Sequence, residues 1–254
     1  MDILSLVRLM QFGDSMLPTG AFAFSSALEA AAQTGVVYDA RTLQQYVVSA
    51  LRQASTGDAV GLAFALRALV ADPVSAGGEV SERTLTRLQN VDTALCRRKL
   101  PEEFRDMMTK TGVKLAELGA RTVPSPLLSR WLSKIASGGT PGSYPVSLAV
   151  LFAATAFAGK PVRGADGKEE EEIFQEGLTV YFYGVAMGIL NASLRLMRVT
   201  HLDAQAVLYR SSSLFEELCR TALSTPLDRM TGYAPMTEIL SAVHARSRVR
   251  LFMS

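Results

Sequence analysis

The sequence predicts one all-α domain, a bundle of about ten helices spanning residues 1–254. Apolar residues recur at three- and four-residue steps along most of the chain, as on one face of a helix. Turn-forming Gly, Pro and Asp residues separate these segments, and no run of short alternating strands lies between them. Because 48% of the 254 residues are apolar, the chain can bury a sizeable core of its own.

The first helix of the bundle begins near Ile3 and is broken by Pro18 and Gly20. Either Ser25 or Ser26 can cap the helix that follows, since a serine hydroxyl accepts a hydrogen bond from a first-turn amide. Aromatic side chains stand at the break itself. This segment is therefore a loop whose aromatic residues either enter the core or face a partner.

The middle of the chain carries the clearest amphipathic patterns. Residues 39–55 have one apolar stripe and begin at Asp39, a good N-cap residue. Residues 81–96 repeat the pattern behind Ser81. Pro101 then opens a further helix with two glutamates in its first turn, where they face the positive end of the helix dipole. Three consecutive helices are expected here.

Residues 177–194 form an uncharged stretch long enough to span a membrane. The stretch contains tyrosines, Asn191 and three glycines, so a central buried helix is the favoured interpretation and a membrane span the alternative. Gly184 and Gly188 are four residues apart and share one helix face, which lets another backbone approach closely. That face is expected in the middle of the bundle or at a subunit interface.

The last helices follow a run of four acidic residues, 169–172, which is expected to open the helix containing residues 177–194. The apolar pattern resumes over residues 202–222. Thr200 with Asp203 three residues later resembles a capping box and predicts the start of that helix.

The charge is nearly balanced, at 26 basic against 24 acidic residues, and the net excess of +2 lies within residues 230–254. A charge this small does not support nucleic-acid binding. Cys96 and Cys219 lie far apart, and the first residues lack the pattern of a signal peptide. We therefore expect a cytoplasmic protein with two free thiols in its core.

The sequence contains few residues suited to catalysis or metal binding. Its only histidines are His201 and His244, too few for a dedicated metal site of three or four ligands. Phosphate-binding, dinucleotide-binding and nucleophile-elbow motifs are missing. A non-catalytic protein without metal or cofactor is the favoured interpretation, and an α-helical hydrolase or lyase that uses His201 or His244 as acid or base is the alternative.

Two segments suggest a surface that binds a partner. The first is residues 17–29, which read LPTGAFAFSSALE. The second is the C-terminal tail, residues 246–254, which reads RSRVRLFMS. Its arginines at every second position would share one side of an extended chain. A terminus ending in Leu-Phe-Met is too apolar to stay in solvent, so either the body of the protein or a partner should bury it.

Together these segments resemble the UreF family of urease accessory proteins. The N-terminal pattern of that family is matched by Asp14, Leu17, Pro18, Gly20, Phe22, Ser25, Leu28 and Glu29, and its C-terminal signature by His244, Arg250, Leu251, Phe252 and Ser254. Glu103, Arg105, Gly112, Asp203 and Gln205 match positions between them. The chain departs from the pattern in places: Ala27 stands where the family has glycine.

The resemblance implies a cytoplasmic homodimer that performs no catalysis of its own. Proteins of this family bind the accessory protein UreD, also called UreH, and recruit the nickel-carrying GTPase UreG to apo-urease for nickel insertion, and a role in modulating GTP hydrolysis has been proposed for them. By matching positions, the UreD contact is expected at Pro18, Gly20, Phe22, Ser25, Arg246, Arg250, Leu251, Phe252, Met253 and Ser254. Dimer contact and GTPase docking are expected near Tyr183, Gly184, Gly188 and Gln205.

Overall fold

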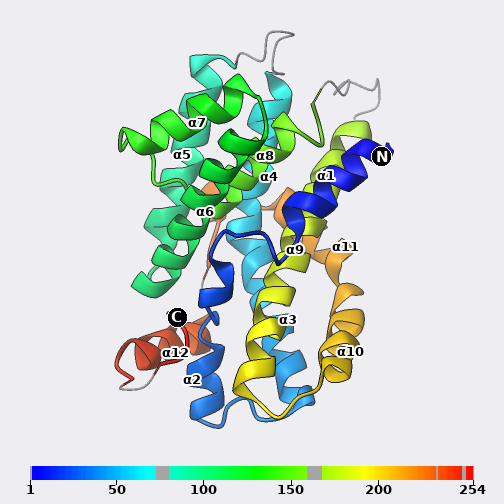
Figure 1. Cartoon of the computed structure of the whole chain (residues 1–254), viewed down its shortest axis with the longest axis vertical. Coiled ribbons are helices and arrows are strands. Elements are labelled where there is room, and N and C mark those ends of the chain that lie inside the picture. Colours follow the sequence, from blue (N-terminus) through cyan, green and yellow to red (C-terminus); the bar gives the residue numbers. More distant parts are fainter. Residues whose placement is uncertain (1, 73–79, 159–167, 233, 248–249, 254) are drawn as a thin grey trace.

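The computed structural model describes residues 2–72, 80–158, 168–232, 234–247 and 250–253. These residues are helical and contain no strand, which confirms the predicted all-α fold (Figure 1). The α-helices are α1 (Ile3–Gly13), α2 (Leu28–Gln33), α3 (Ala40–Thr56), α4 (Asp58–Ala71), α5 (Glu82–Arg98), α6 (Glu102–Thr122), α7 (Pro126–Ala136), α8 (Tyr144–Ala154), α9 (Lys168–Leu196), α10 (His201–Ser212), α11 (Phe215–Ser224) and α12 (Pro235–Ala245). Two short 3-10 helices are η1 (Ala21–Ala23) and η2 (Leu227–Arg229).

The helix starts follow the predicted capping residues. Asp39, Ser81 and Thr200 are the N-caps of α3, α5 and α10, and each side chain accepts a hydrogen bond from the backbone amide three residues later. At α10 the carboxylate of Asp203 bonds back to the amide of Thr200, which completes the predicted capping box. Because capping involves only neighbouring residues, the sequence was sufficient to place these starts.

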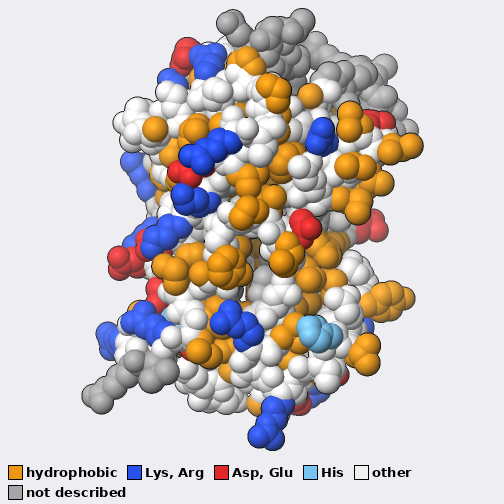
Figure 2. Space-filling view, in the orientation of Figure 1, with side chains coloured by type: hydrophobic (Ala, Val, Ile, Leu, Met, Phe, Trp, Pro, Cys, Tyr) orange, Lys and Arg blue, Asp and Glu red, His pale blue; other side chains and the backbone are white. Residues whose placement is uncertain are grey.

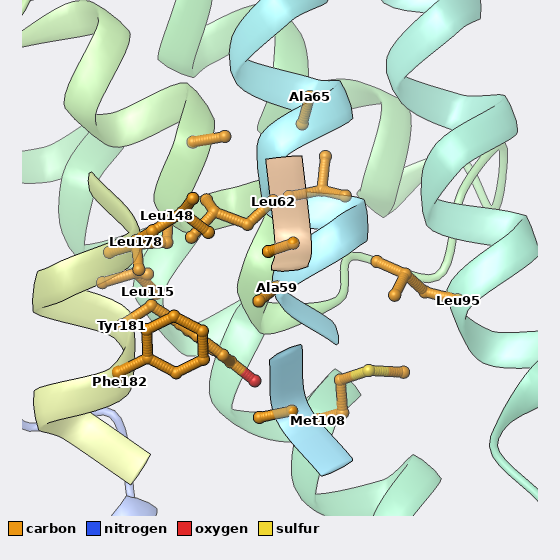
Figure 3. Packing of buried hydrophobic residues seen from close by; sticks show 14 of the residues in the cluster. Ala59, Leu62, Ala65, Leu95, Met108, Leu115, Leu148, Leu178, Tyr181 and Phe182 are labelled. Carbon is orange, nitrogen blue, oxygen red and sulfur yellow. The ribbon is translucent and has the colours of Figure 1, made fainter. Parts of the chain in front are cut away.

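The core is built around α4, which packs against α3, α5, α8 and α9. Its buried residues Ala59, Leu62 and Ala65 lie among side chains from α5, α6, α8 and α9 (Figure 3). Small and large residues alternate along α4, so the surrounding helices approach it closely. In Figure 1, α5 to α8 lie in one half of the molecule, whereas α2, α10 and α12 lie in the other.

Gly112 permits the close contact between α6 and α8. A Cβ atom at this position would lie 2.2 Å from the carbonyl oxygen of Gly142 and 2.4 Å from the amide nitrogen of Tyr144. Both are backbone atoms, so no side chain could rotate away to make room. A glycine is therefore required where α6 crosses the start of α8.

Helix α9 is 29 residues long and contacts α1, α2, α3, α4, α10 and α11. By length and composition, residues 171–196 and 40–71 could each cross a membrane, but 50% and 67% of the apolar windows within them are buried against other helices. The core helix of a soluble protein passes the same test, so the two stretches are weak evidence for a span. Helix α9 nevertheless has one open side, which lines a hollow described below.

Candidate functional site

The C-terminal tail folds back onto the body and is held by backbone hydrogen bonds. The amides of Leu251 and Phe252 donate to the carboxylate of Glu29 at 2.8 and 3.0 Å. The amide of Met253 donates to the carbonyl of Ala23 in η1 at 2.7 Å. The Phe252 side chain is only 5% exposed. The body of the protein, and not a partner, therefore buries the central aromatic residue of the tail.

The described arginines of the tail, Arg246 and Arg250, have different backbone environments. Arg246 is the C-cap of α12 and has helical backbone angles, so the prediction of one extended side beginning at this residue is wrong. Arg250 lies beyond the helix, where its guanidinium donates to the carboxylate of Glu103 at 3.3 Å and to the carbonyl of Ala245 at 2.5 Å. Arg248 and Ser254 lie outside the described residues.

A cluster of ionisable side chains lies beneath the tail. His244 is fully buried, and its Nε2 lies 3.1 Å from Glu29, while its Nδ1 lies 3.1 Å from both carboxylate oxygens of Glu103. The hydroxyl of Ser241 also approaches Glu103, at 3.5 Å. These residues come from α2, α6 and α12, so the cluster joins three helices that are remote in sequence. We call Glu29, Glu103, His244 and Arg250 the tail cluster.

The environment of Glu29 favours its ionised form. Burial by itself raises the pKa of this carboxyl group, but hydrogen bonds from the Leu251 amide, from His244 and from the Phe252 amide outweigh that effect. The pKa of Glu29 therefore lies below its ordinary value. An ionised Glu29 can accept hydrogen bonds from both tail amides and from His244 at the same time, and these bonds hold the tail on the body.

The turn before α2 lies beside the tail, because Met253 bonds to Ala23. Phe22 in this turn is 74% exposed, and Leu251 and Met253 are 61% and 53% exposed. The predicted partner-binding residues therefore divide into two groups. Phe22, Leu251 and Met253 are exposed apolar residues of the turn and the tail, which we call the tail surface, whereas Phe252 is buried.

Neighbouring residues shape this turn. Pro18 is exposed, and Gly20 has a φ of 81°, a backbone conformation that favours glycine. Ser25 is buried, and its hydroxyl accepts a hydrogen bond from the Glu29 amide at 3.3 Å. The N-cap of α2 is nevertheless Ala27, with a φ of 62°, rather than one of the two serines. The left-handed conformation of Ala27 gives a physical reason for glycine at the matching position of the family pattern.

A hollow of about 270 Å³ lies between the turn, α6 and the open side of α9. Phe22 and Phe252 line it together with Gly184 and Gly188, and hydrophobic side chains surround the hollowed middle of the face in Figure 2. Added Cβ atoms at the two glycines would have no neighbour within 4 Å. Their face therefore does not lie in the packed middle of the bundle, the first of the two predicted locations.

One charged pair lies in the wall of this hollow. The Lys99 ammonium lies 2.5 Å from the Asp58 carboxylate, and both side chains are largely buried. The Tyr181 hydroxyl donates to the same carboxylate at 3.3 Å. Because the carboxylate is neutralised and hydrogen-bonded, the pair suits a structural role in the wall.

The remaining predicted docking residues lie elsewhere on the surface. Tyr183 is exposed on α9, and Gln205 is exposed on α10. Neither residue lines the hollow. The structure thus brings Gly184 and Gly188 together with the turn and the tail, which were predicted to serve a different partner, and it leaves Gln205 apart from them.

The histidines do not form a catalytic site. Both ring nitrogens of His244 are already engaged by carboxylates in a position closed to solvent, so no substrate can reach them. His201 is exposed at the first residue of α10. Among the described residues, no group of three or more His, Cys, Asp or Glu side chains is placed to hold a metal ion. The geometry does not favour the hydrolase or lyase alternative.

Sequence reasoning missed the part that Glu29, Glu103 and His244 play in holding the tail. All three matched the family pattern, but Glu29 and Glu103 were given no role, and His244 was considered only as the acid or base of the enzyme alternative. Glu29 is an acidic residue between the apolar residues Leu28 and Ala30 of a short helix, which was an available signal. Its partners lie more than 200 residues away in sequence, so the pairing itself could not have been found by spacing.

The fold and the site define an all-α protein whose C-terminal tail packs beside the turn that precedes α2. A sequence model of the UreF family matches residues 37–161. The chain is 42% identical to the urease accessory protein UreF of Yersinia enterocolitica, and 41% identical to the proteins of that name from Yersinia pestis and Yersinia pseudotuberculosis. Each match covers 99% of both chains. The chain belongs to the UreF family of urease accessory proteins, and its relatives are named as accessory proteins rather than as enzymes.

Proposed function

We propose that this protein binds UreD (UreH) and recruits the nickel-carrying GTPase UreG to apo-urease, so that nickel is inserted and the metallocentre matures. It acts in the cytoplasm as a homodimer, without a cofactor of its own and without binding nucleic acid or membranes. Membership of the UreF family supports the pathway. The observation that carries the proposal is the tail surface, since exposed apolar side chains fixed on a rigid support are typical of protein interfaces.

The tail surface is the proposed contact for UreD. Phe22, Leu251 and Met253 are all more than half exposed, although the backbone around them is held by hydrogen bonds to Glu29 and Ala23. A fixed backbone lowers the entropic cost of binding, because the partner does not have to order the tail. This surface is thus suited to a stable complex.

The open side of α9 and the exposed face of α10 are the proposed sites for the second copy of the chain and for UreG. Gly184 and Gly188 have empty space above them, which permits close approach by another helix. Tyr183 directly precedes Gly184 on α9, and Gln205 lies on the next helix, α10. Both side chains are exposed. We assign the glycine face to the dimer, and Tyr183 and Gln205 to UreG.

Binding of purified UreD to the full chain tests the first assignment. We expect Phe22→Ser and Leu251→Ser each to weaken binding by about 30-fold, the cost of losing an interface anchor worth about 2 kcal/mol. Leu202→Ser is the matched control, because Leu202 is 82% exposed on α10 and distant from the tail in sequence. Unchanged UreD affinity in both tail-surface variants would contradict the assignment.

Recruitment of UreG by the preformed complex with UreD tests the second assignment. We expect Tyr183→Ala and Gln205→Ala to reduce UreG capture while UreD stays bound. GTP turnover by UreG, measured with and without the complex, then determines whether docking also changes hydrolysis. Capture of UreG that is equal in both variants and the unsubstituted chain would remove Tyr183 and Gln205 from the proposed site.

A further inference from the structure

His244 occupies an unusual position between two carboxylates. Its Nε2 faces Glu29 and its Nδ1 faces Glu103, each at 3.1 Å, and the ring is closed to solvent. A neutral imidazole has one N–H donor and one acceptor nitrogen, so it can satisfy only one ionised carboxylate. Either the imidazole carries two protons, therefore, or one of the glutamates carries a proton.

The other hydrogen bonds of the two glutamates decide between these states. Glu29 accepts hydrogen bonds from the amides of Leu251 and Phe252, one on each carboxylate oxygen. Glu103 accepts from the guanidinium of Arg250 at 3.3 Å and faces the hydroxyl of Ser241 at 3.5 Å. The amides of Leu251 and Phe252 and the guanidinium of Arg250 can only donate, and donors favour a carboxylate over a carboxylic acid. These hydrogen bonds therefore fit a carboxylate on each side of the imidazole ring.

We infer that His244 is a buried imidazolium that positions the C-terminal tail, by donating one proton to each of the two carboxylates that hold the tail. The assignment balances the charge of the tail cluster, with two carboxylates against one imidazolium and one guanidinium. Removing the imidazolium would leave the buried carboxylate of Glu29 and the partly buried carboxylate of Glu103 with Arg250 as their only counter-charge, and uncompensated buried charge is strongly unfavourable.

Other charged groups lie near the cluster but do not replace His244. A second hollow between α6 and α12 has a volume of about 590 Å³ and is lined by Glu102, Glu103, Asp106, Lys110, Glu238 and Arg250. The ammonium of Lys110 already pairs with Asp106 at 2.7 Å. Since this hollow adds more acidic than basic groups, it increases the need for a positive charge on His244.

The imidazolium links the tail to the body through charge. Glu29 binds the tail backbone, Glu103 binds Arg250 of the tail, and His244 holds both carboxylates. His244 is thus a positioning residue, which contacts no partner itself. Any contribution of His244 to UreD binding rests on the proposed function. Its protonation state and its effect on the tail can be measured in the isolated chain.

Nitrogen NMR of the full chain with ¹⁵N-labelled histidine tests the protonation state directly. The sequence contains only His201 and His244, so the side-chain spectrum holds two sets of signals, and the exposed His201 identifies the solvent-accessible set. At pH 7 we expect His244 to show a directly bonded proton on both ring nitrogens. A single protonated nitrogen at His244 would overturn the inference and place the missing proton on a glutamate.

Hydrogen exchange of the Leu251 and Phe252 amides tests the positioning role. We expect His244→Gln to accelerate their exchange at least about tenfold, because the carboxylate that holds them loses a charged donor. His201→Gln is the matched control and should leave the exchange unchanged. If His244→Gln leaves tail exchange unchanged, His244 does not position the tail.

A charge-rescue variant separates the role of the proton from that of packing. Without the imidazolium, Glu29 and Glu103 share Arg250 as the only counter-charge of the tail cluster. Adding Glu103→Gln to His244→Gln removes the excess negative charge, so we expect the double variant to recover part of the lost protection. Exchange in the double variant as fast as in His244→Gln would indicate that His244 only fills space, and would overturn the inference. All of these experiments use the chain without UreD, so their outcome is independent of the outcome of the binding experiment. If His244→Gln fails to fold, the NMR measurement on the unsubstituted chain still decides the protonation state.

Discussion

Replacing Gly184 with leucine probes the face of α9 that is open within one copy of the chain. Because no protein atom lies within 4 Å of an added Cβ, the new side chain meets open space in the isolated chain. Glycine is a poor helix former and leucine a good one, so the substitution should stabilise α9 by about 0.5–1 kcal/mol. The fold is expected to be retained, with an equal or slightly higher melting temperature.

A second helix packed on this face would respond very differently. Forcing extra methylene groups into a packed contact costs about 1–3 kcal/mol. At 1.4 kcal/mol per factor of ten, this weakens association by about 5-fold to 150-fold. Gly184→Leu should therefore combine an intact fold with a larger fraction of monomer, a combination that an ordinary core mutation does not produce.

Thermal unfolding and light scattering over a concentration series measure these two effects separately. Gln175→Leu is the matched control, because it places the same side chain at an exposed position of the same helix, nine residues earlier. The control should change neither folding nor association. Unchanged association of Gly184→Leu would refute the assignment of this face to the dimer. A loss of folding would refute the inference that a leucine side chain at this position has free space within one copy of the chain.

Three further predictions concern the fold and the tail. Gly112→Ala should destabilise the protein by about 1–3 kcal/mol or more in urea unfolding, since its Cβ would meet backbone atoms of α8, whereas Gly188→Ala should not destabilise it. Asp92→Ala should cost on the order of 3 kcal/mol in the same assay, because this buried carboxylate accepts hydrogen bonds from Thr140 and from the amides of Gly142 and Ser143. The pKa of Glu29 is lowered, so its contribution is present above the ordinary value of 4.5 and is lost as the pH falls through the folded value; hydrogen exchange of the tail should rise only in acid below that pH.

Sequence patterns predicted the features of this fold that depend on near neighbours. The N-caps Asp39, Ser81 and Thr200 were found because each bonds to a backbone amide three residues away. At α2 the prediction was only partly correct: the Ser25 hydroxyl bonds to the first-turn amide of Glu29, but the N-cap position is Ala27, whose left-handed conformation serine capping rules do not anticipate. Helix caps can be predicted from the sequence where the backbone adopts a common conformation.

The candidate site depends on contacts between residues that are far apart in the chain. Residue types identified Phe22 and the apolar tail as segments that either the body or a partner should bury, but they could not tell which of the two buries Phe252. That outcome is decided by Glu29, which is separated from Phe252 by 223 residues and holds its amide at 3.0 Å. Long-range pairing of this kind leaves no periodicity to detect, so a structure was needed to divide the tail into a buried anchor and an exposed tip.

The hollow beside α9 links two contacts that were assigned to different partners. Phe22 and Phe252 support the surface proposed for UreD, whereas Gly184 and Gly188 form the face proposed for the dimer, and all four line the same space. A UreD segment that enters the hollow beside Phe22 and Phe252 would therefore approach the glycine face that is proposed for the second copy of the chain. Because the two binding events share a boundary, UreD affinity and self-association should be coupled. Tyr183 and Gln205, which both lie outside this lining, offer a site that is free of that coupling.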